Sequence, residues 1–325
     1  MTTVSPIRRT STSEGRSGPV EIALVNTMPD AAFEETERQF TRLLEAGAEG
    51  RPHHISLYSI PERTRSQVVR RVLADRYQGL GALYRRPPDA VVVTGSEPRQ
   101  FDLRDEAIWV SLSGLIRWAR RSTSSVLLSC LAAHASLLAV EGIERERLPA
   151  KHSGVYPQWT AGSHPLTAGL GPVSFPHSRL HDVPVPVVED HGYTVVLQSE
   201  EVGWTVAASG GECLVVMVQG HPEYAPTTLL REYRRDVRRY LTGRVRDYPR
   251  IPGGYLDAGG VRLLKDFEDH ALAGERDATV LEAFPFQACA DRIDVDWQAP
   301  MERLAGNWFT EVQRRKLAQT GRRAG

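Results

Sequence analysis

The sequence has few cysteines, no excess of either charge and no long apolar run. Its three cysteines, Cys130, Cys213 and Cys289, are too few for a disulfide framework and lack metal-ligand spacing, which favours a reducing, cytoplasmic compartment. The 40 basic and 40 acidic side chains give a formal net charge of zero, which argues against nucleic-acid partners and polybasic membrane anchors. No apolar run approaches the roughly 18 residues of a membrane span, and the N-terminus lacks the apolar centre of a signal peptide. We therefore expect small molecules as partners.

The 325 residues are enough for one large domain with an appendage or for two domains. Residues 1–18 are rich in Ser, Thr, Arg and Gly, so we expect a mobile, disordered tail. A main domain is predicted for residues 19–243. Residues 244–325 are less periodic and are predicted to be a C-terminal extension packed on the core.

Apolar runs alternate with amphipathic segments through the first half of the chain. Buried strands are predicted at 20–25, 55–58, 90–95 and 126–129. Helical spacing of apolar residues predicts helices at 34–44 and 108–120. This alternation predicts an α/β fold with a doubly wound, mostly parallel sheet that helices cover on both faces.

The second half begins with a segment, residues 151–186, that is rich in Pro, Gly, His and Ser, and loops are predicted to dominate it. Strands are predicted to return to the sheet at 195–197, 204–207 and 214–218. A helix is predicted over 227–241, since Pro226 suits its start and Gly243 its end.

Cys130 lies where the apolar strand 126–129 passes into an alanine-rich helix start. A cysteine at such an elbow exposes its sulfur above the helix N-terminus, where the dipole and free N–H groups favour the thiolate. A buried structural role is the alternative for a lone cysteine at a strand end. The elbow predicts a nucleophile.

A second apolar run, residues 213–218, leads to Gly220-His221-Pro222-Glu223-Tyr224. The strand therefore delivers a histidine and, two residues later, a carboxylate at its C-terminal end, where open α/β sheets keep their active sites. An imidazole can hold the proton of a thiol, and a carboxylate can orient that imidazole. Cys130, His221 and Glu223 are the predicted catalytic residues.

Seven motifs occur in an order that resembles one enzyme family. They are Asn26-Thr27-Met28-Pro29, Thr36-Glu37-Arg38-Gln39-Phe40, Val93-Thr94-Gly95, Cys130, Lys151-His152-Ser153-Gly154-Val155-Tyr156, Pro176-His177-Ser178-Arg179 and Gly220-His221-Pro222-Glu223-Tyr224. The set is similar to the homoserine O-acyltransferases of methionine biosynthesis, which are succinyl- and acetyltransferases with a glutamine amidotransferase-like, flavodoxin-like fold. The similarity covers roughly residues 20–242, and a weaker similarity occurs at 306–309.

The resemblance implies that 19–243 is a catalytic acyltransferase domain. Cys130 would take the acyl group from an acyl-CoA as a thioester, with His221 as general base and Glu223 supporting it. Acyl-CoA would be a co-substrate, and no permanently bound cofactor or metal is expected. The N–H of Leu131 at the elbow could bind the oxyanion. The oligomeric state is left open, with a homodimer as one outcome.

The resemblance also implies an acceptor site. The substrate-binding residues of the family fall on Lys151, Ser178 and Arg235. An amino-acid acceptor carries a carboxylate, and Lys or Arg can pair with it. Homoserine is the expected acceptor, and serine is an alternative.

The chain departs from the family at two places. It has Asp30 where the family commonly has a lysine after Met-Pro. In the loop after Thr94-Gly95, an ungapped reading places Arg99 at the position that tends to discriminate acyl donors. Arginine favours succinyl-CoA over acetyl-CoA because it can pair with the free carboxylate, whereas a shift of two residues would place Glu97 there and reverse the inference.

Two other function classes compete. A glutamine amidotransferase-like amide hydrolase shares the elbow cysteine and a His-x-Glu, but its usual flanking glycines are replaced by Leu128 and Ala132. A non-catalytic binding protein has no physical reason to keep all three catalytic residue types. His134 is predicted not to be the base, and His177 and His181 have the i, i+4 spacing of metal ligands without a third ligand.

Overall fold

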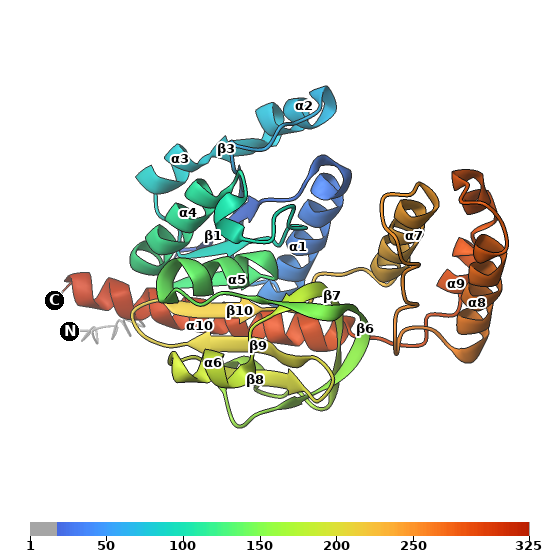
Figure 1. The fold of residues 1–325 in the computed structure, drawn as a ribbon. Helices are drawn as coiled ribbons and strands as arrows, with labels where there is room; N and C mark the ends of the chain where they lie inside the picture. The colour runs from blue at the N-terminus through green and yellow to red at the C-terminus, as the bar shows by residue number, and fades with distance from the viewer. Residues whose placement is uncertain (1–17, 325) are drawn as a thin grey trace, which may run out of the picture.

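The computed structural model describes residues 18–324, and a mixed sheet of ten strands organises this part of the chain (Figure 1). The strand order is β3-β2-β1-β4-β5-β10-β9-β8-β6-β7. The strands are β1 Val20–Asn26, β2 His53–Ser59, β3 Tyr77–Gly79, β4 Ala90–Val93, β5 Ser125–Ser129, β6 Glu146–Thr160, β7 Val173–Asp182, β8 Thr194–Ser199, β9 Gly203–Ser209 and β10 Leu214–Val218. The predicted tail lies outside the described residues apart from Gly18.

The half of the sheet from β3 to β10 is parallel, and β9, β8, β6 and β7 continue it in antiparallel pairing. The register of β5 and β10 pairs Ser129 with Val218. Two strands far apart in the sequence therefore end side by side, so Cys130 and the segment after Val218 emerge at the same sheet edge. This edge is the carboxyl end of the parallel strands, as the sequence predicted.

Helices cover both faces, which confirms the predicted doubly wound α/β class. On β1, Ile22 and Leu24 join the apolar cluster that includes α1 and α10, whereas Ala23 and Val25 join the cluster of α4 and α5. The longer helices are α1 Phe33–Ala48, α2 Gln67–Arg76, α4 Trp109–Ser122, α7 Thr228–Leu241, α8 Ala258–Leu272 and α10 Gln298–Ala324. The short ones are α3 Leu80–Arg85, α5 Leu131–Ser136, α6 Val185–Asp190 and α9 Phe286–Ala290, with short 3-10 or π segments η1 Asp30–Ala32, η2 Leu103–Asp105, η3 Leu137–Glu141, η4 Pro165–Thr167 and η5 Ala278–Ala283.

The prediction of loops over 151–186 was wrong, because β6 and β7 form a long antiparallel hairpin there. Alternate residues of β7 are buried, but among them are His177 and Arg179, which are 0% and 4% exposed. Polar residues on the buried face hide the apolar alternation by which a strand is recognised. Cross-strand pairing, which the local sequence does not reveal, makes this segment a strand.

The C-terminal extension contains more regular structure than predicted. Trp297, Met301, Leu304, Trp308 and Val312 recur at spacings of three and four, and all are buried. This spacing is helical, so the signal for α10 was present in the sequence, although the segment was predicted only as a less periodic extension. Helix α10 packs on α1 and runs along the same face of the sheet (Figure 1). The division of the chain into a main domain, residues 19–243, and an extension, residues 244–325, stays a prediction.

Helices α7, α8 and α9 with η5 form a lobe beside the sheet body, and α7 is the part of it nearest the sheet (Figure 1). The lobe has its own apolar contacts, in which the Phe284 ring lies 5.1 Å from that of Phe267 and 6.1 Å from that of Tyr233. Over residues 18–324, no helix is long and apolar enough to cross a membrane.

Candidate active site

Cys130 occupies a strained elbow between β5 and α5. Its φ of 48° and ψ of −105° are unusual for a residue with a side chain. The backbone N–H of Cys130 donates to the carbonyl of Val218 at 2.7 Å, which ties the elbow to β10. A Cβ on Gly95 would lie 3.1 Å from the Cβ of Cys130, so the loop after β4 passes directly beside this side chain. The predicted elbow is therefore present.

His221 and Glu223 follow β10 at the same edge. The backbone N–H of His221 donates to the carbonyl of Pro176 on β7 at 2.8 Å. Gly220 permits this approach, because a Cβ there would lie 2.4 Å from the ring of Phe175. His221 Nδ1 and Glu223 Oε1 are 2.8 Å apart, and both residues are 8% exposed. The pair is thus a buried, fixed unit.

The charges around His221 favour its protonated form. Burial lowers its pKa, but the charge of Glu223 and a hydrogen bond with Cys130 outweigh burial, so the pKa of His221 is raised well above its ordinary value. The structure therefore brings all three predicted catalytic side chains into contact. A cysteine, an imidazole and an orienting carboxylate in this order can perform nucleophilic acyl chemistry.

Tyr224 supports the histidine, and sequence analysis did not assign it a role. Its ring stacks on the imidazole of His221 with centroids 4.2 Å apart and planes at 17°. Its hydroxyl donates to Glu232 at 3.1 Å, and Trp297 donates to its backbone carbonyl at 3.0 Å. Burial raises the pKa of Tyr224. These contacts restrict the ring of His221 to one orientation.

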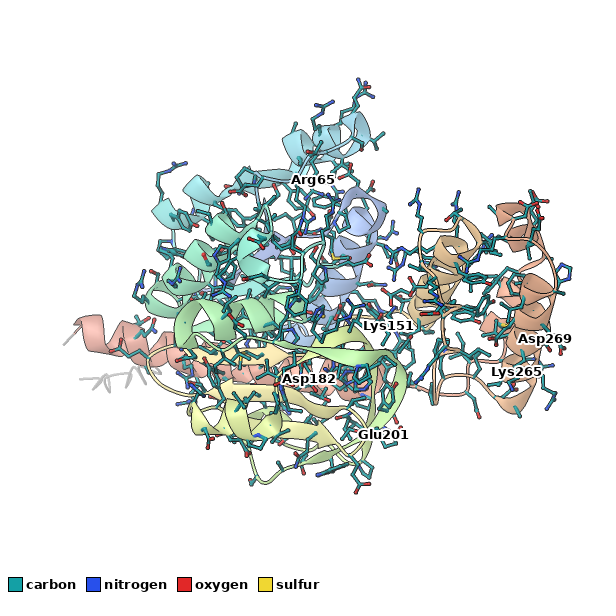
Figure 2. The ribbon with its side chains drawn as sticks, viewed as in Figure 1. Arg65, Lys151, Asp182, Glu201, Lys265 and Asp269 are labelled. Atoms are coloured by element: carbon teal, nitrogen blue, oxygen red, sulfur yellow. The ribbon has the colours of Figure 1, made fainter. Side chains whose placement is uncertain are left out.

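Two of the predicted substrate-binding residues, Lys151 and Arg235, meet Glu97, the alternative donor-specificity residue. We call this group, with Asp236 and Arg239, the outer cluster. Lys151 Nζ lies 2.8 Å from Asp236, and Arg235 Nε donates to the same carboxylate at 3.0 Å. Arg239 binds both oxygens of Glu97 at 2.6 and 2.7 Å and reaches Asp236 at 3.3 Å. Figure 2 shows Lys151 at the junction of the sheet body and α7. Asp236 and Arg239 were missed, since arginine runs on a helix usually mark a solvated face.

The cluster is held by opposite charges. Burial raises the pKa of Asp236, but Lys151 and Arg235 outweigh burial, and the net shift is downward. The same balance applies to Glu97, whose pKa is lowered because Arg239 and Arg235 outweigh burial. Both carboxylates are therefore ionised at neutral pH. A zwitterionic amino acid could exchange partners with this network.

The remaining predicted residues lie apart from these contacts. Arg99 is exposed, and its backbone N–H donates to Glu106. Ser178 pairs with Ser153 across the hairpin and is half-buried on the strand face opposite to Arg179. Among residues 18–324, the side chain of Ser178 makes no hydrogen bond.

Arg179 is a buried cation near Cys130 that sequence analysis left without a role. It lies 3.1 Å from Asp182, which Figure 2 labels, and it donates to the carbonyls of His181 and Val202. Burial lowers the pKa of Arg179, whereas the charges of Asp182 and Cys130 raise it. Arg179 is therefore a buried cation close enough to Cys130 for the two groups to interact electrostatically. Its place in Pro176-His177-Ser178-Arg179 was the available signal.

The other histidines have structural positions. His134 Nε2 lies 2.8 Å from Gln219 Oε1, and burial lowers the pKa of His134 to about 3. It is thus a neutral core residue. His177 lies 3.1 Å from Thr205 Oγ1, and burial holds its pKa well below the ordinary value. No group of three or more metal-ligating side chains occurs within the described range 18–324.

The fold and the site together define a class: an α/β protein with a cysteine at a strand-helix elbow and a histidine–glutamate pair just after the neighbouring strand. A family model described as homoserine O-succinyltransferase matches residues 2–316. Curated relatives with that name include one from Rhodopseudomonas palustris, which is 39% identical over 90% of this chain and 88% of the relative. Another, from Bradyrhizobium japonicum, is 40% identical over 82% and 83%.

The chain therefore belongs to the homoserine O-succinyltransferase family. Membership confirms the resemblance found in the sequence and the predicted enzyme class. Among solved structures, SMU.1228c has a TM-score of 0.50 at 11% identity, covering 90% of this chain and 100% of that chain. This likeness concerns the fold alone.

Proposed function

We propose that this protein transfers a succinyl group from succinyl-CoA to the hydroxyl of L-homoserine through a thioester on Cys130. The observation that carries the proposal is the strained elbow of Cys130 against the His221–Glu223 pair in a member of this family. The product would be O-succinylhomoserine, an intermediate of methionine biosynthesis in the cytoplasm.

In the first half-reaction, the thiolate of Cys130 attacks the thioester carbonyl of succinyl-CoA. The bond to the CoA sulfur breaks, and the leaving thiolate takes the proton from His221. The N–H of Leu131 begins α5 and has no acceptor within its own helix, so it suits the oxyanion of the tetrahedral intermediate. Arg179 adds positive charge near the nucleophile.

In the second half-reaction, His221 takes the proton of the homoserine hydroxyl, and the alkoxide attacks the thioester on Cys130. The ester forms, and the cysteine leaves as a thiolate. Glu223 stabilises the imidazolium at this step and keeps Nδ1 engaged, so that Nε2 faces the reacting groups. The stacked ring of Tyr224 limits other orientations.

The outer cluster supports acceptor binding. Lys151 and Arg235 share Asp236 as their partner, and the homoserine carboxylate would compete for these cations. The ammonium group of homoserine would then pair with the carboxylate of Asp236 that these cations leave. The site thus suits a zwitterion better than a simple alcohol. Serine carries the same charges and is the alternative acceptor.

The donor is assigned from Arg99 and from the family. Glu97 is paired with Arg239, so it does not neutralise Arg99 in this arrangement. The guanidinium of Arg99 is therefore free to bind the carboxylate of a succinyl group. The acetyl group of acetyl-CoA has no carboxylate that the guanidinium of Arg99 could bind.

Intact-mass measurement after mixing the protein with succinyl-CoA, acetyl-CoA or glutamine tests the proposal. We expect a succinyl adduct that homoserine removes and that Cys130→Ser abolishes. Cys213→Ser is the matched control, since Cys213 is buried against Thr123 and should leave the adduct intact. An adduct with glutamine but not with succinyl-CoA would indicate amide hydrolysis instead.

A further inference from the structure

A cleft on the lobe is lined by arginines on one wall and by apolar side chains on the other. Its volume is about 540 Å³, and its lining residues are Arg231, Arg234, Arg235, Arg238, Leu281 and Phe286. The four arginines recur along α7 at i, i+3, i+4 and i+7, so they share one helix face. Leu281 and Phe286 come from η5 and α9, which pack against α7 (Figure 1).

The charge of this wall is only partly balanced. Arg231 has Glu35 at 3.4 Å, and Arg235 is paired within the outer cluster. Among residues 18–324, neither Arg234 nor Arg238 has a carboxylate within 4.0 Å. Arg234 lies over the ring of Phe284, 5.8 Å from its centroid. Like charges at these spacings destabilise a helix, so an anion on this face would relieve a repulsion present in the free protein.

We infer that this cleft binds the nucleotide end of the acyl-CoA donor, an inference that rests on the proposed function. That end carries a diphosphate, a 3′-phosphate and a flat adenine ring. Guanidinium groups bind phosphate oxygens in a bidentate manner, and an aromatic and aliphatic wall suits the adenine. Inorganic phosphate would not use the apolar wall. A nucleic acid would need a longer basic surface than one cleft in a chain of zero net charge.

The position of the cleft fits a donor whose thioester reaches Cys130. Arg235 belongs both to the cleft and to the outer cluster. Glu97, another member of that cluster, lies two residues after Gly95, which borders Cys130. The chain of contacts therefore runs from the nucleophile through the outer cluster to the arginine wall. The pantetheine arm would follow this route.

The test compares two donors, succinyl-CoA and succinyl-pantetheine, which has the same thioester but no nucleotide. In the double variant Arg234→Ala/Arg238→Ala, we expect KM for succinyl-CoA to rise by about tenfold or more, as for the loss of charged hydrogen bonds. KM for succinyl-pantetheine should stay near the wild-type value. Arg262→Ala, which removes an exposed arginine of α8 outside the cleft, is the matched control and should change neither value.

A second measurement uses adenosine 3′,5′-bisphosphate as the probe. We expect it to compete with succinyl-CoA in the wild type and to lose about tenfold in affinity in the double variant. The variant Arg234→Lys/Arg238→Lys should recover part of this affinity, because it keeps the charge without the bidentate geometry. Equal changes for both donors, or no change for either, would overturn the cleft assignment.

The outcomes separate this inference from the proposed function. A wild-type protein that forms no succinyl adduct from either donor contradicts the function. If the wild type uses both donors and the double variant has the same KM values as the wild type, only the assignment of the nucleotide to this cleft is contradicted.

Discussion

The His221–Glu223 pair and the outer cluster differ in burial and in the number of charged partners available to each group. His221 and Glu223 are both 8% exposed, and Glu223 is the carboxylate that pairs with the histidine. In the outer cluster, Asp236 is shared by three cations, Lys151, Arg235 and Arg239. The first arrangement fixes one geometry for chemistry, whereas the second can exchange ion pairs when a charged substrate arrives.

From this difference we expect the two parts to respond differently to mutation. Loss of a group in the buried part removes a step of the reaction or leaves a partner unsatisfied. Loss of a group in the outer part should weaken binding, because other charges remain nearby and solvent screens them. Four substitutions examine this contrast, in order of decreasing effect.

Cys130→Ser should have the largest effect, with kcat reduced by at least about a thousandfold, because a serine hydroxyl here lacks the reactivity of a thiolate. Steady-state turnover of succinyl-CoA with homoserine measures it. Cys213→Ser should keep near-normal turnover and serves as the control. A Cys130→Ser enzyme with most of its activity would contradict the thioester mechanism.

Glu223→Gln should reduce kcat by about 10- to 100-fold, less than His221→Ala, because it keeps the base but removes its charge support. The substitution should also lower the pKa of His221, since the charge of Glu223 is the leading cause that raises it. NMR titration of the histidine ring nitrogens measures this shift. An unchanged titration of His221 would show that Glu223 does not control its protonation.

The same raised pKa has a consequence for stability. A histidine whose pKa is higher in the folded than in the unfolded protein stabilises the fold fully below the unfolded value of 6.5, and this contribution is lost as pH rises through the folded pKa. The stability advantage of wild type over Glu223→Gln should therefore shrink at alkaline pH. Denaturant unfolding at several pH values measures it.

Arg235→Ala should raise KM for homoserine by about tenfold or more, through loss of a charged hydrogen bond to the acceptor carboxylate. Because Arg235 also lines the proposed nucleotide cleft, acylation of Cys130 without acceptor is compared at saturating succinyl-CoA, where it should stay within the same order of magnitude. Single-turnover acylation separates the two half-reactions, and Arg262→Ala is the control. If acylation at saturating donor fell together with the acceptor reaction, the effect of Arg235 would not be specific to the acceptor.

Arg99→Ala should have the smallest effect, a decrease of about tenfold in the preference for succinyl-CoA over acetyl-CoA. The ratio of kcat/KM for the two donors measures it. Glu97→Gln should change this ratio less, because Glu97 binds Arg239. A wild-type preference for acetyl-CoA would contradict the assignment of Arg99.

The parts of the fold that depend on local sequence were predictable. Strand β4 is a continuous apolar run, and β1 is apolar from Ile22 to Val25, and such buried runs are recognised without a distant partner. The β6–β7 hairpin was not predictable in this way, because its buried face holds His177 and Arg179. Helix α10 was a different case, since its apolar spacing was present and could have been read.

The sequence by itself determined the elbow at Cys130, the place of His221-Pro222-Glu223 and the α/β class, because each follows from a short segment and from the rule that parallel strands end at one edge. Only the tertiary structure decided which charges meet. Glu97 and Arg239 are 142 residues apart in the chain, and Lys151 and Asp236 are 85 apart. Ion pairs of this kind have no local signature, because their partners meet only where α7 lies beside the sheet body (Figure 1).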